Sequence, residues 1–200
     1  FFDYMGPRFD FDALGTIGHN TLLVDGKGQH AAGREYGAEY FGKIIEFQTG
    51  AEVDITVGDA TAAYAGIVDR YVRTIAFVKP DLVLIFDEVA ASEPRYLEWL
   101  FHHDGEIDGD EDVTTIRVGE AILTLTRILP EEVDCWRTSD VIRTSKYINS
   151  DSLLPERPKV RYRSFGPFHP VEGMDVMWSA WVGDPDAVPS LVVTATDSGL

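Results

Sequence analysis

The sequence is short of cysteine, of basic residues and of long apolar runs. Its single cysteine, Cys135, excludes an internal disulfide and any zinc site built from cysteines. Lys and Arg number 17 against 34 Asp and Glu, and the resulting net charge of −17 opposes binding to nucleic acid and to anionic membranes. Its apolar runs fall short of the roughly 18 residues that span a bilayer. We therefore expect neither nucleic acid nor a membrane as a partner.

The residues that are present favour β-structure, because apolar and polar side chains alternate with a period of two. Two hairpins are the clearest, one with strands 70–78 and 82–86 around a Lys-Pro-Asp turn, the other with strands 113–117 and 121–128. Further strands are predicted at 21–24, 43–47, 52–57, 96–102, 174–182 and 191–196. Turns rich in Gly, Asp and Pro separate them. The sequence predicts one all-β domain over 1–200, an antiparallel β-sandwich of two or more sheets with almost no helix.

Three segments depart from this pattern. Residues 59–64 are compatible with a single helical turn that has Asp59 as its N-cap. Residues 138–159 lack periodicity and contain Ser, Asn, Asp and Pro, which predicts a long loop. The acidic residues of 106–112 are interpreted as a solvated loop, because they lack the ligand spacing of an EF-hand.

The most specific segment is Gly-His-Asn-Thr-Leu-Leu-Val-Asp-Gly-Lys-Gly-Gln at 18–29. A polar pair, His19 and Asn20, opens an apolar strand that ends at an Asp-Gly turn. A histidine in this position can bind a metal or act as an acid or base, and an asparagine can hold a substrate carbonyl or carboxylate. The alternative is that His19 only caps the end of the strand.

Adjacent histidines, His102 and His103, end another predicted strand. Because neighbouring strand residues point to opposite faces, only one of them can face a given site. We favour His102 as the catalytic candidate, against the alternative of a structural histidine.

Other candidates lie in the strands and turns nearby. Arg73 is a candidate for substrate binding, although ion pairs of Arg70 and Arg73 with Asp87 or Glu88 are an alternative. Tyr64 is a second substrate-binding candidate, with a role in the core as its alternative.

The segment at 18–29 resembles the His-Asn-Thr-x-x-Val-Asp-Gly-x-Gly-Gln stretch of the heparinase II/III-like domain, which occurs in heparin/heparan sulfate, alginate and oligoalginate lyases. Three more segments resemble that family in the same order: Gly-Asp-Ala followed by Tyr64, the hairpin at 70–88, and Glu-Trp-Leu-Phe-His at 98–102. The resemblance covers most of residues 15–107.

This resemblance implies a polysaccharide lyase that cleaves uronate-containing glycans by β-elimination, in a cleft between an α/α toroid and β-sheets. It also implies a zinc ion held by His19, by an upstream aspartate and by a His-x-Asp strand. Asp3 is the best match for the aspartate, and Asp10 and Asp12 compete with it; the His-x-Asp strand has no counterpart in this sequence, so the zinc site is expected to be incomplete here. Our candidate catalytic residues are His19, Asn20 and His102, because such side chains can neutralise the uronate carboxylate and so stabilise the enolate that forms. A periplasmic or secreted location is expected from the family.

The N-terminus shows no basic targeting segment and no initiator Met, so we expect a fragment whose toroid lies upstream and which is inactive alone. A net charge of −17 would repel a polyanionic glycan, unless the toroid supplies a basic cleft or the substrate is short or lightly charged. The alternative is a noncatalytic sandwich that binds carbohydrate or supports a neighbouring domain.

Overall fold

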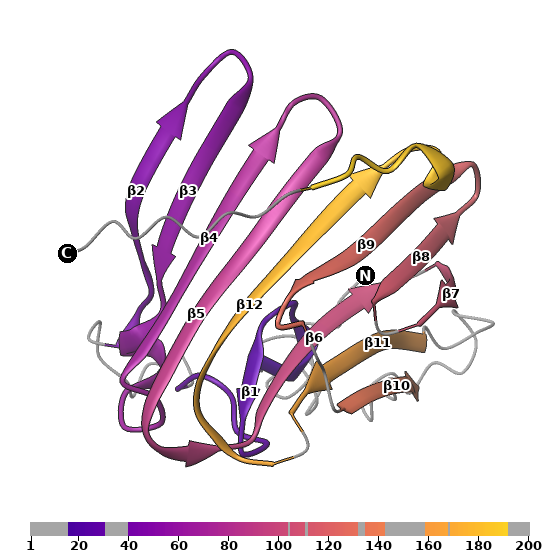
Figure 1. The fold of residues 1–200 in the computed structure, drawn as a ribbon. Coiled ribbons are helices and arrows are strands. Elements are labelled where there is room, and N and C mark those ends of the chain that lie inside the picture. The colour runs from indigo at the N-terminus through magenta and orange to yellow at the C-terminus, as the bar shows by residue number, and fades with distance from the viewer. Residues whose placement is uncertain are drawn as a thin grey trace, which may run out of the picture.

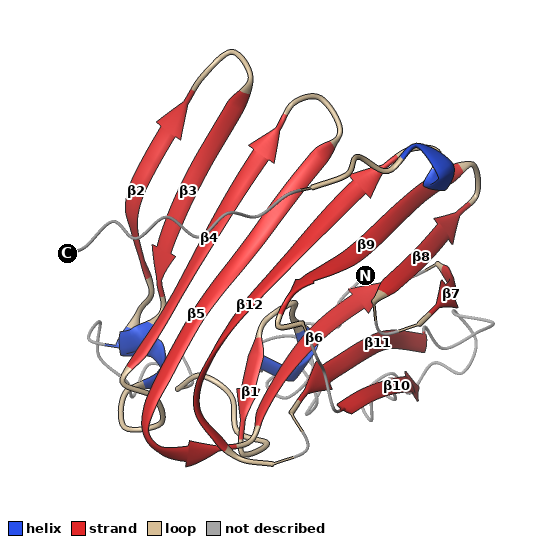
Figure 2. Cartoon of the chain, viewed as in Figure 1, coloured by secondary structure: helices blue, strands red, loops and turns tan. Residues whose placement is uncertain are grey.

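The fold consists of two antiparallel β-sheets packed face to face (Figures 1 and 2). The computed structural model describes residues 16–30, 40–103, 105–110, 112–131, 135–142, 159–167 and 169–191. Within these residues the helical elements are short 3₁₀ turns, and none is long and apolar enough to cross a membrane. The prediction of an all-β sandwich is confirmed.

The larger sheet has eight strands in the order β2-β3-β4-β5-β12-β9-β8-β7. Their bounds are β2 Lys43–Thr49, β3 Val53–Asp59, β4 Arg70–Val78, β5 Leu82–Arg95, β12 Val171–Val182, β9 Ala121–Leu129, β8 Val113–Val118 and β7 Glu106–Gly109. The smaller sheet has four strands in the order β1-β6-β11-β10. Its strands are β1 Leu22–Val24, β6 Leu97–His103, β11 Lys159–Gly166 and β10 Cys135–Ile142.

Both predicted hairpins are confirmed, as β4-β5 and β8-β9. The second strand of the first hairpin continues to Arg95, well beyond the predicted end at residue 86. It extends because β12 pairs with β5 along the opposite edge, from Trp181 opposite Leu82 to Val171 opposite Arg95. A long neighbour thus keeps the backbone of β5 hydrogen-bonded where the apolar pattern has already ended.

Aromatic side chains fill the space between the sheets. Trp178 of β12 is 1% exposed and packs edge to face on Phe165 of β11 with 4.6 Å between ring centroids. Phe165 also stacks on Trp99 of the neighbouring strand β6, at 5.6 Å. Such rings bury large apolar areas and prefer these tilted and offset arrangements. The interface between the sheets is therefore the main core of the described chain.

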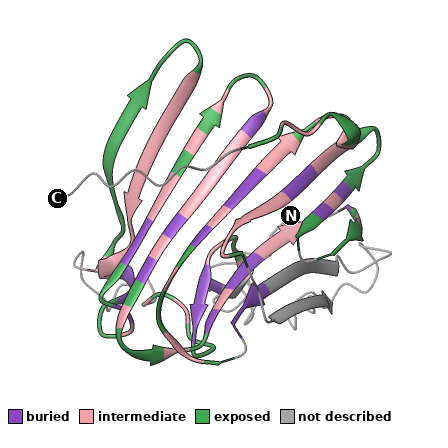
Figure 3. Ribbon diagram, in the orientation of Figure 1, coloured by how far each residue is buried: buried purple, intermediate pink, exposed green. Residues whose placement is uncertain are grey.

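The smaller sheet covers only part of the larger one, at the lower right of Figure 3. Tyr71, Ile75 and Phe77 of β4 lie on the face of the larger sheet that also carries Trp178. Ile75 pairs with Ile85 of β5, which in turn pairs with Trp178 of β12, and alternate residues of a strand share one face. Exposure on this face rises from 2% at Tyr71 to 39% at Ile75 and 36% at Phe77. The buried end of β4 is thus the end that lies close to the smaller sheet.

The irregular segments were predicted less well. Residues 138–142, predicted as a loop, belong to β10, and β11 was not predicted at all. The acidic segment at 106–112 includes strand β7. The helical turn is confirmed as a 3₁₀ turn at Thr61–Tyr64, where Asp59 accepts a hydrogen bond from the backbone of Thr61 although Ala60 occupies the cap. Of the strand predicted at 191–196, Leu191 is not in a strand and the rest lies outside the described residues.

Gly166 allows strands β11 and β6 of the smaller sheet to approach each other closely. A Cβ on Gly166 would lie 1.9 Å from the carbonyl oxygen of Leu97, which is an impossible contact with backbone. Gly166→Ala is therefore expected to lower the free energy of unfolding by about 1–3 kcal/mol or more, as overpacking does. Gly58→Ala is the control, because a Cβ there would lie 3.9 Å from the nearest oxygens and would fit. Denaturant titration of both variants measures the difference, and equal stabilities would contradict the prediction.

Candidate functional site

His19 and Asn20 lie on the surface at the entry to a fully buried strand. Both side chains are exposed, whereas Leu22 and Val24 of β1 have no exposed surface. A 3₁₀ turn at Thr16–Gly18 precedes the pair, and the backbone N–H of His19 donates to the Thr16 carbonyl at 3.1 Å. The apolar strand thus anchors the backbone while the polar pair stays accessible.

Asn20 extends the pairing of β1 with β6 by means of its side chain. β1 pairs with β6 from Leu22 opposite Trp99, and the next N–H of β6 on this edge, that of Leu100, donates to the Thr21 carbonyl at 2.8 Å. The N–H of His102 then donates to Oδ1 of Asn20 at 2.6 Å. Because a backbone N–H can only donate, this contact identifies the oxygen of the amide. The Nδ2 group of Asn20 therefore lies on the other side, and no described residue accepts a hydrogen bond from it.

Arg73 holds the backbone of the same residue. Its Nη1 donates to the Asn20 carbonyl at 2.7 Å. Its Nε and Nη2 each donate to Asp87 at 2.7 Å, so that the guanidinium and the carboxylate form a bidentate pair. On the opposite face of the hairpin, Arg70 pairs with Glu88 at 3.0 Å. The ion pairs that the sequence offered as an alternative are thus confirmed, and substrate binding by Arg73 stays a prediction.

Asp87 is the most buried charged group of the site, with 1% of its surface exposed. Besides Arg73, it accepts a hydrogen bond from the indole of Trp99 at 2.8 Å, and the hydroxyl of Tyr71 lies 3.5 Å away. Burial acts to lower the pKa of Arg73, but its hydrogen bonds with Asp87 and its neighbours raise that pKa overall, so the guanidinium stays charged. Burial also raises the pKa of Tyr71, which keeps its phenol neutral.

Tyr64 lies beneath the polar pair and is completely buried. Its hydroxyl donates to the Leu22 carbonyl at 2.5 Å and lies 3.4 Å from the hydroxyl of Thr21. Burial raises the pKa of Tyr64, so the phenol is neutral near pH 7. These contacts show Tyr64 supporting β1 from within the core; its predicted role in substrate binding stays a prediction.

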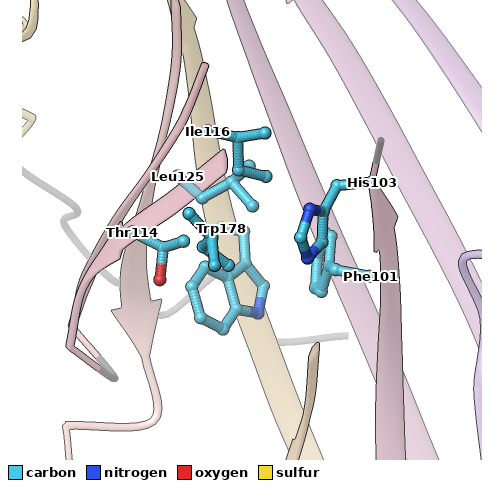
Figure 4. A pocket seen from close by; sticks show the side chains of 7 residues that line it. Phe101, His103, Thr114, Ile116, Leu125 and Trp178 are labelled. Carbon is cyan, nitrogen blue, oxygen red and sulfur yellow. The ribbon is translucent and has the colours of Figure 1, made fainter. Parts of the chain in front are cut away.

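The two histidines of β6 point to opposite faces, as expected. Figure 4 shows His103 beside Phe101 and Trp178 in an apolar pocket between the sheets. Nδ1 of His103 is 3.0 Å from the Gly105 carbonyl. His102 points away from this pocket, and both its ring nitrogens are shielded from solvent. Its backbone contacts Asn20, so His102 belongs to the site through its N–H, and catalysis by its imidazole stays a prediction.

The described residues do not form a metal site by themselves. No three His, Cys, Asp or Glu side chains converge among them. Asp3, Asp10 and Asp12, the aspartates considered as partners for His19, lie outside the described residues. A zinc ion bound by His19 and Asp3 therefore stays a prediction, and the chemistry proposed below does not depend on it.

The sequence offered Asp87 only as an ion-pair partner of Arg70 or Arg73, and did not identify Trp99 as a member of the site. A signal for Asp87 was present, because it interrupts the apolar strand Leu-Val-Leu-Ile-Phe directly after Phe86. An acidic residue there requires a partner, and Arg73 is paired with it across the hairpin. Trp99 carried no such signal, because its contact depends on how the two sheets pack.

The comparisons with known proteins agree on one family. The family model described as "Heparinase II/III-like, C-terminal" matches residues 2–154. No curated protein matches the chain. Among solved structures, the heparinase III described as the BT4657 gene product is 16% identical with a TM-score of 0.66, over 91% of this chain and 27% of that one.

A second solved structure is a heparan sulfate lyase, HepC from Pedobacter heparinus, at 12% identity and a TM-score of 0.65. The match covers 86% of this chain and 25% of that one. This chain thus spans about a quarter of the length of the solved proteins that it resembles. At such low identity these structures establish the fold, and the family model, which covers most of the sequence, establishes the relationship. The chain belongs to the heparinase II/III-like family and corresponds to its C-terminal region.

Proposed function

We propose that the protein containing this chain is a polysaccharide lyase that cleaves uronate-containing glycans by β-elimination, and that Asn20 binds the uronate carboxylate. The observation that carries this proposal is the fixed orientation of the Asn20 amide. Its oxygen is held by the His102 N–H and its carbonyl by Arg73, so the exposed side chain is fixed and its Nδ2 donors have no acceptor among the described residues. A donor fixed in advance stabilises charge without having to reorganise during the reaction.

The chemistry of elimination explains why such a donor is useful. Removing the proton next to a uronate carboxylate places negative charge on that carboxylate as an enolate forms. Hydrogen bonds from Asn20 Nδ2, and from His19 beside it, would be stronger to the enolate than to the ground state, which lowers the barrier. A base must remove the proton and an acid must protonate the leaving oxygen. We assign these two roles to the cleft that the α/α toroid is predicted to complete.

The net negative charge of the chain restricts the substrates that it can attract. A net charge of −17 disfavours long-range attraction of a polyanion, and the positive charge of Arg73 is balanced by Asp87. The proposal therefore includes a basic surface on the toroid, or a short or lightly charged substrate. We take heparan sulfate as the first glycan to test, because one similar solved protein is a heparan sulfate lyase.

The test is to incubate the whole protein with heparan sulfate and, separately, with alginate. We expect ultraviolet absorbance from the unsaturated uronate product with one of them, and mass spectrometry should show fragments that have a double bond at the new non-reducing end. The variant His19→Ala is expected to stay folded and to lose most turnover, because an exposed side chain contributes little packing. Binding of either glycan without cleavage would instead support a noncatalytic carbohydrate-binding sandwich.

A further inference from the structure

Asp87 is a charged group at a position where the loss of hydration opposes its charged form. It lies between the sheets with 1% exposure, and its ion pair with Arg73 is largely removed from water. Removing both ions of such a pair from water is costly, and well-packed apolar residues often replace a buried pair with equal or greater stability. The contribution of Asp87 to stability is thus a weak reason for a carboxylate at this position.

The remaining contacts of the Arg73–Asp87 pair connect it to the exposed residues His19 and Asn20. All three nitrogens of the Arg73 guanidinium donate to the chain itself, two to Asp87 and the third to the Asn20 carbonyl. The carboxylate holds the planar guanidinium in one orientation, and Trp99 in turn fixes the carboxylate. Arg73 is therefore held rigidly, with Nη1 directed at the loop that carries His19 and Asn20.

The position of the Asn20 amide depends on two contacts made at different atoms. Arg73 holds its carbonyl at 2.7 Å, and the N–H of His102 holds its side-chain oxygen at 2.6 Å. Without the first contact, the Asn20 carbonyl would lose its hydrogen bond, and Asn20 would be held by the His102 contact to its side chain and by the neighbouring bond from the Leu100 N–H to the Thr21 carbonyl. A displacement of about 1 Å at a substrate-binding group is enough to reduce turnover about 100-fold.

We propose that Asp87 and Arg73 are positioning residues, which act through the Asn20 carbonyl to set the location of the Asn20 amide at the substrate. The inference rests on the proposed function for its effect on turnover. Its structural part, that the pair holds the loop and thereby protects the His102 N–H, is independent of any activity.

The decisive variant removes both charges at once. Single substitutions such as Asp87→Asn leave a charged Arg73 beside a neutral partner and risk unfolding. The double variant Arg73→Met/Asp87→Leu fills the same space with apolar side chains and loses the hydrogen bond to Asn20. It also leaves the Trp99 indole and the Tyr71 hydroxyl without Asp87 as acceptor, so a thermal melt is measured to show that the variant is folded. The matched control is Arg70→Met/Glu88→Leu, which removes the exposed ion pair on the other face of the same two strands.

Two measurements are made on each folded variant of the whole protein. Hydrogen exchange of the His102 amide, whose N–H bonds to Asn20, should become about tenfold faster in the Arg73/Asp87 variant and stay unchanged in the control. The kcat should fall about 100-fold in the former with a much smaller change in KM, since the amide acts most in the transition state.

The exchange measurement separates this inference from the proposed function. Faster exchange at His102 in a protein that shows no lyase activity would support the positioning of the loop and count against the lyase proposal. Unchanged exchange in a folded Arg73→Met/Asp87→Leu variant would overturn the inference, whatever the activity. Wild-type kcat in that variant would likewise overturn it and leave the pair a structural feature.

Discussion

Asn20→Asp is expected to lower the turnover of a uronate substrate by about 100-fold or more, the loss typical when one donor that stabilises developing negative charge is removed. The substitution changes one NH₂ group to oxygen and keeps the shape of the side chain. A carboxylate oxygen can still accept the hydrogen bond from the His102 N–H, so the loop should stay in place. The change removes the Nδ2 donors and puts a negative charge at the position where we propose that the substrate carboxylate binds.

The measurement is kcat/KM for elimination, together with a thermal melt to show that the variant is folded. Gln48→Glu is the matched control, because it makes the same change from amide to carboxylate on the exposed strand β2, away from the site. It should leave kcat/KM near the wild-type value. An Asn20→Asp enzyme with wild-type kcat/KM would show that the Nδ2 group does not contact the substrate.

Local pattern was sufficient to predict the hairpins of the larger sheet. In β4-β5 and β8-β9 the partners are adjacent in sequence, and alternating side chains bounded by short turns identify both strands. Strand β11 was missed although a local signal was present, because Lys-Val-Arg-Tyr-Arg at its start alternates polar and apolar residues. The alternation is short and directly follows the aperiodic stretch that was predicted as a loop through residue 159. The partners of β11 are also not its nearest predicted strand neighbours, since Phe165 meets Trp99, 66 positions earlier in the chain.

The candidate site shows the same division. His19 and Asn20 were identified because a polar pair at the mouth of an apolar strand is visible in the local sequence. What holds them was not visible: the Asn20 contacts join residues 53 and 82 positions apart. Alternation along β6 predicted that the two histidines diverge, but which of them enters the space between the sheets depends on how the sheets pack. Sequence thus located the exposed donor and left its support to be found in the structure.

Trp178→Ala is expected to have the largest effect on stability of any substitution proposed for this chain. The side chain is 1% exposed and contacts two rings of the smaller sheet, Phe165 at 4.6 Å and Phe101 at 5.3 Å between centroids. Replacing it with alanine removes apolar contact from both sheets and leaves a cavity where they meet. Comparable substitutions of buried aromatic residues cost about 3–5 kcal/mol. For a domain of 200 residues the midpoint of thermal unfolding should fall by roughly 10 °C.

Trp181→Ala supplies the control within the same strand. Three residues further along β12, Trp181 points to the opposite face of the larger sheet and is only partly buried, with its indole 3.2 Å from the Asp184 carbonyl. Its loss should cost about 1 kcal/mol. Calorimetry of both variants compares the same chemical change on the two faces of one strand. Equal losses would mean that the two faces are buried to a similar extent in the folded protein, and that the contact between the sheets is not its main core.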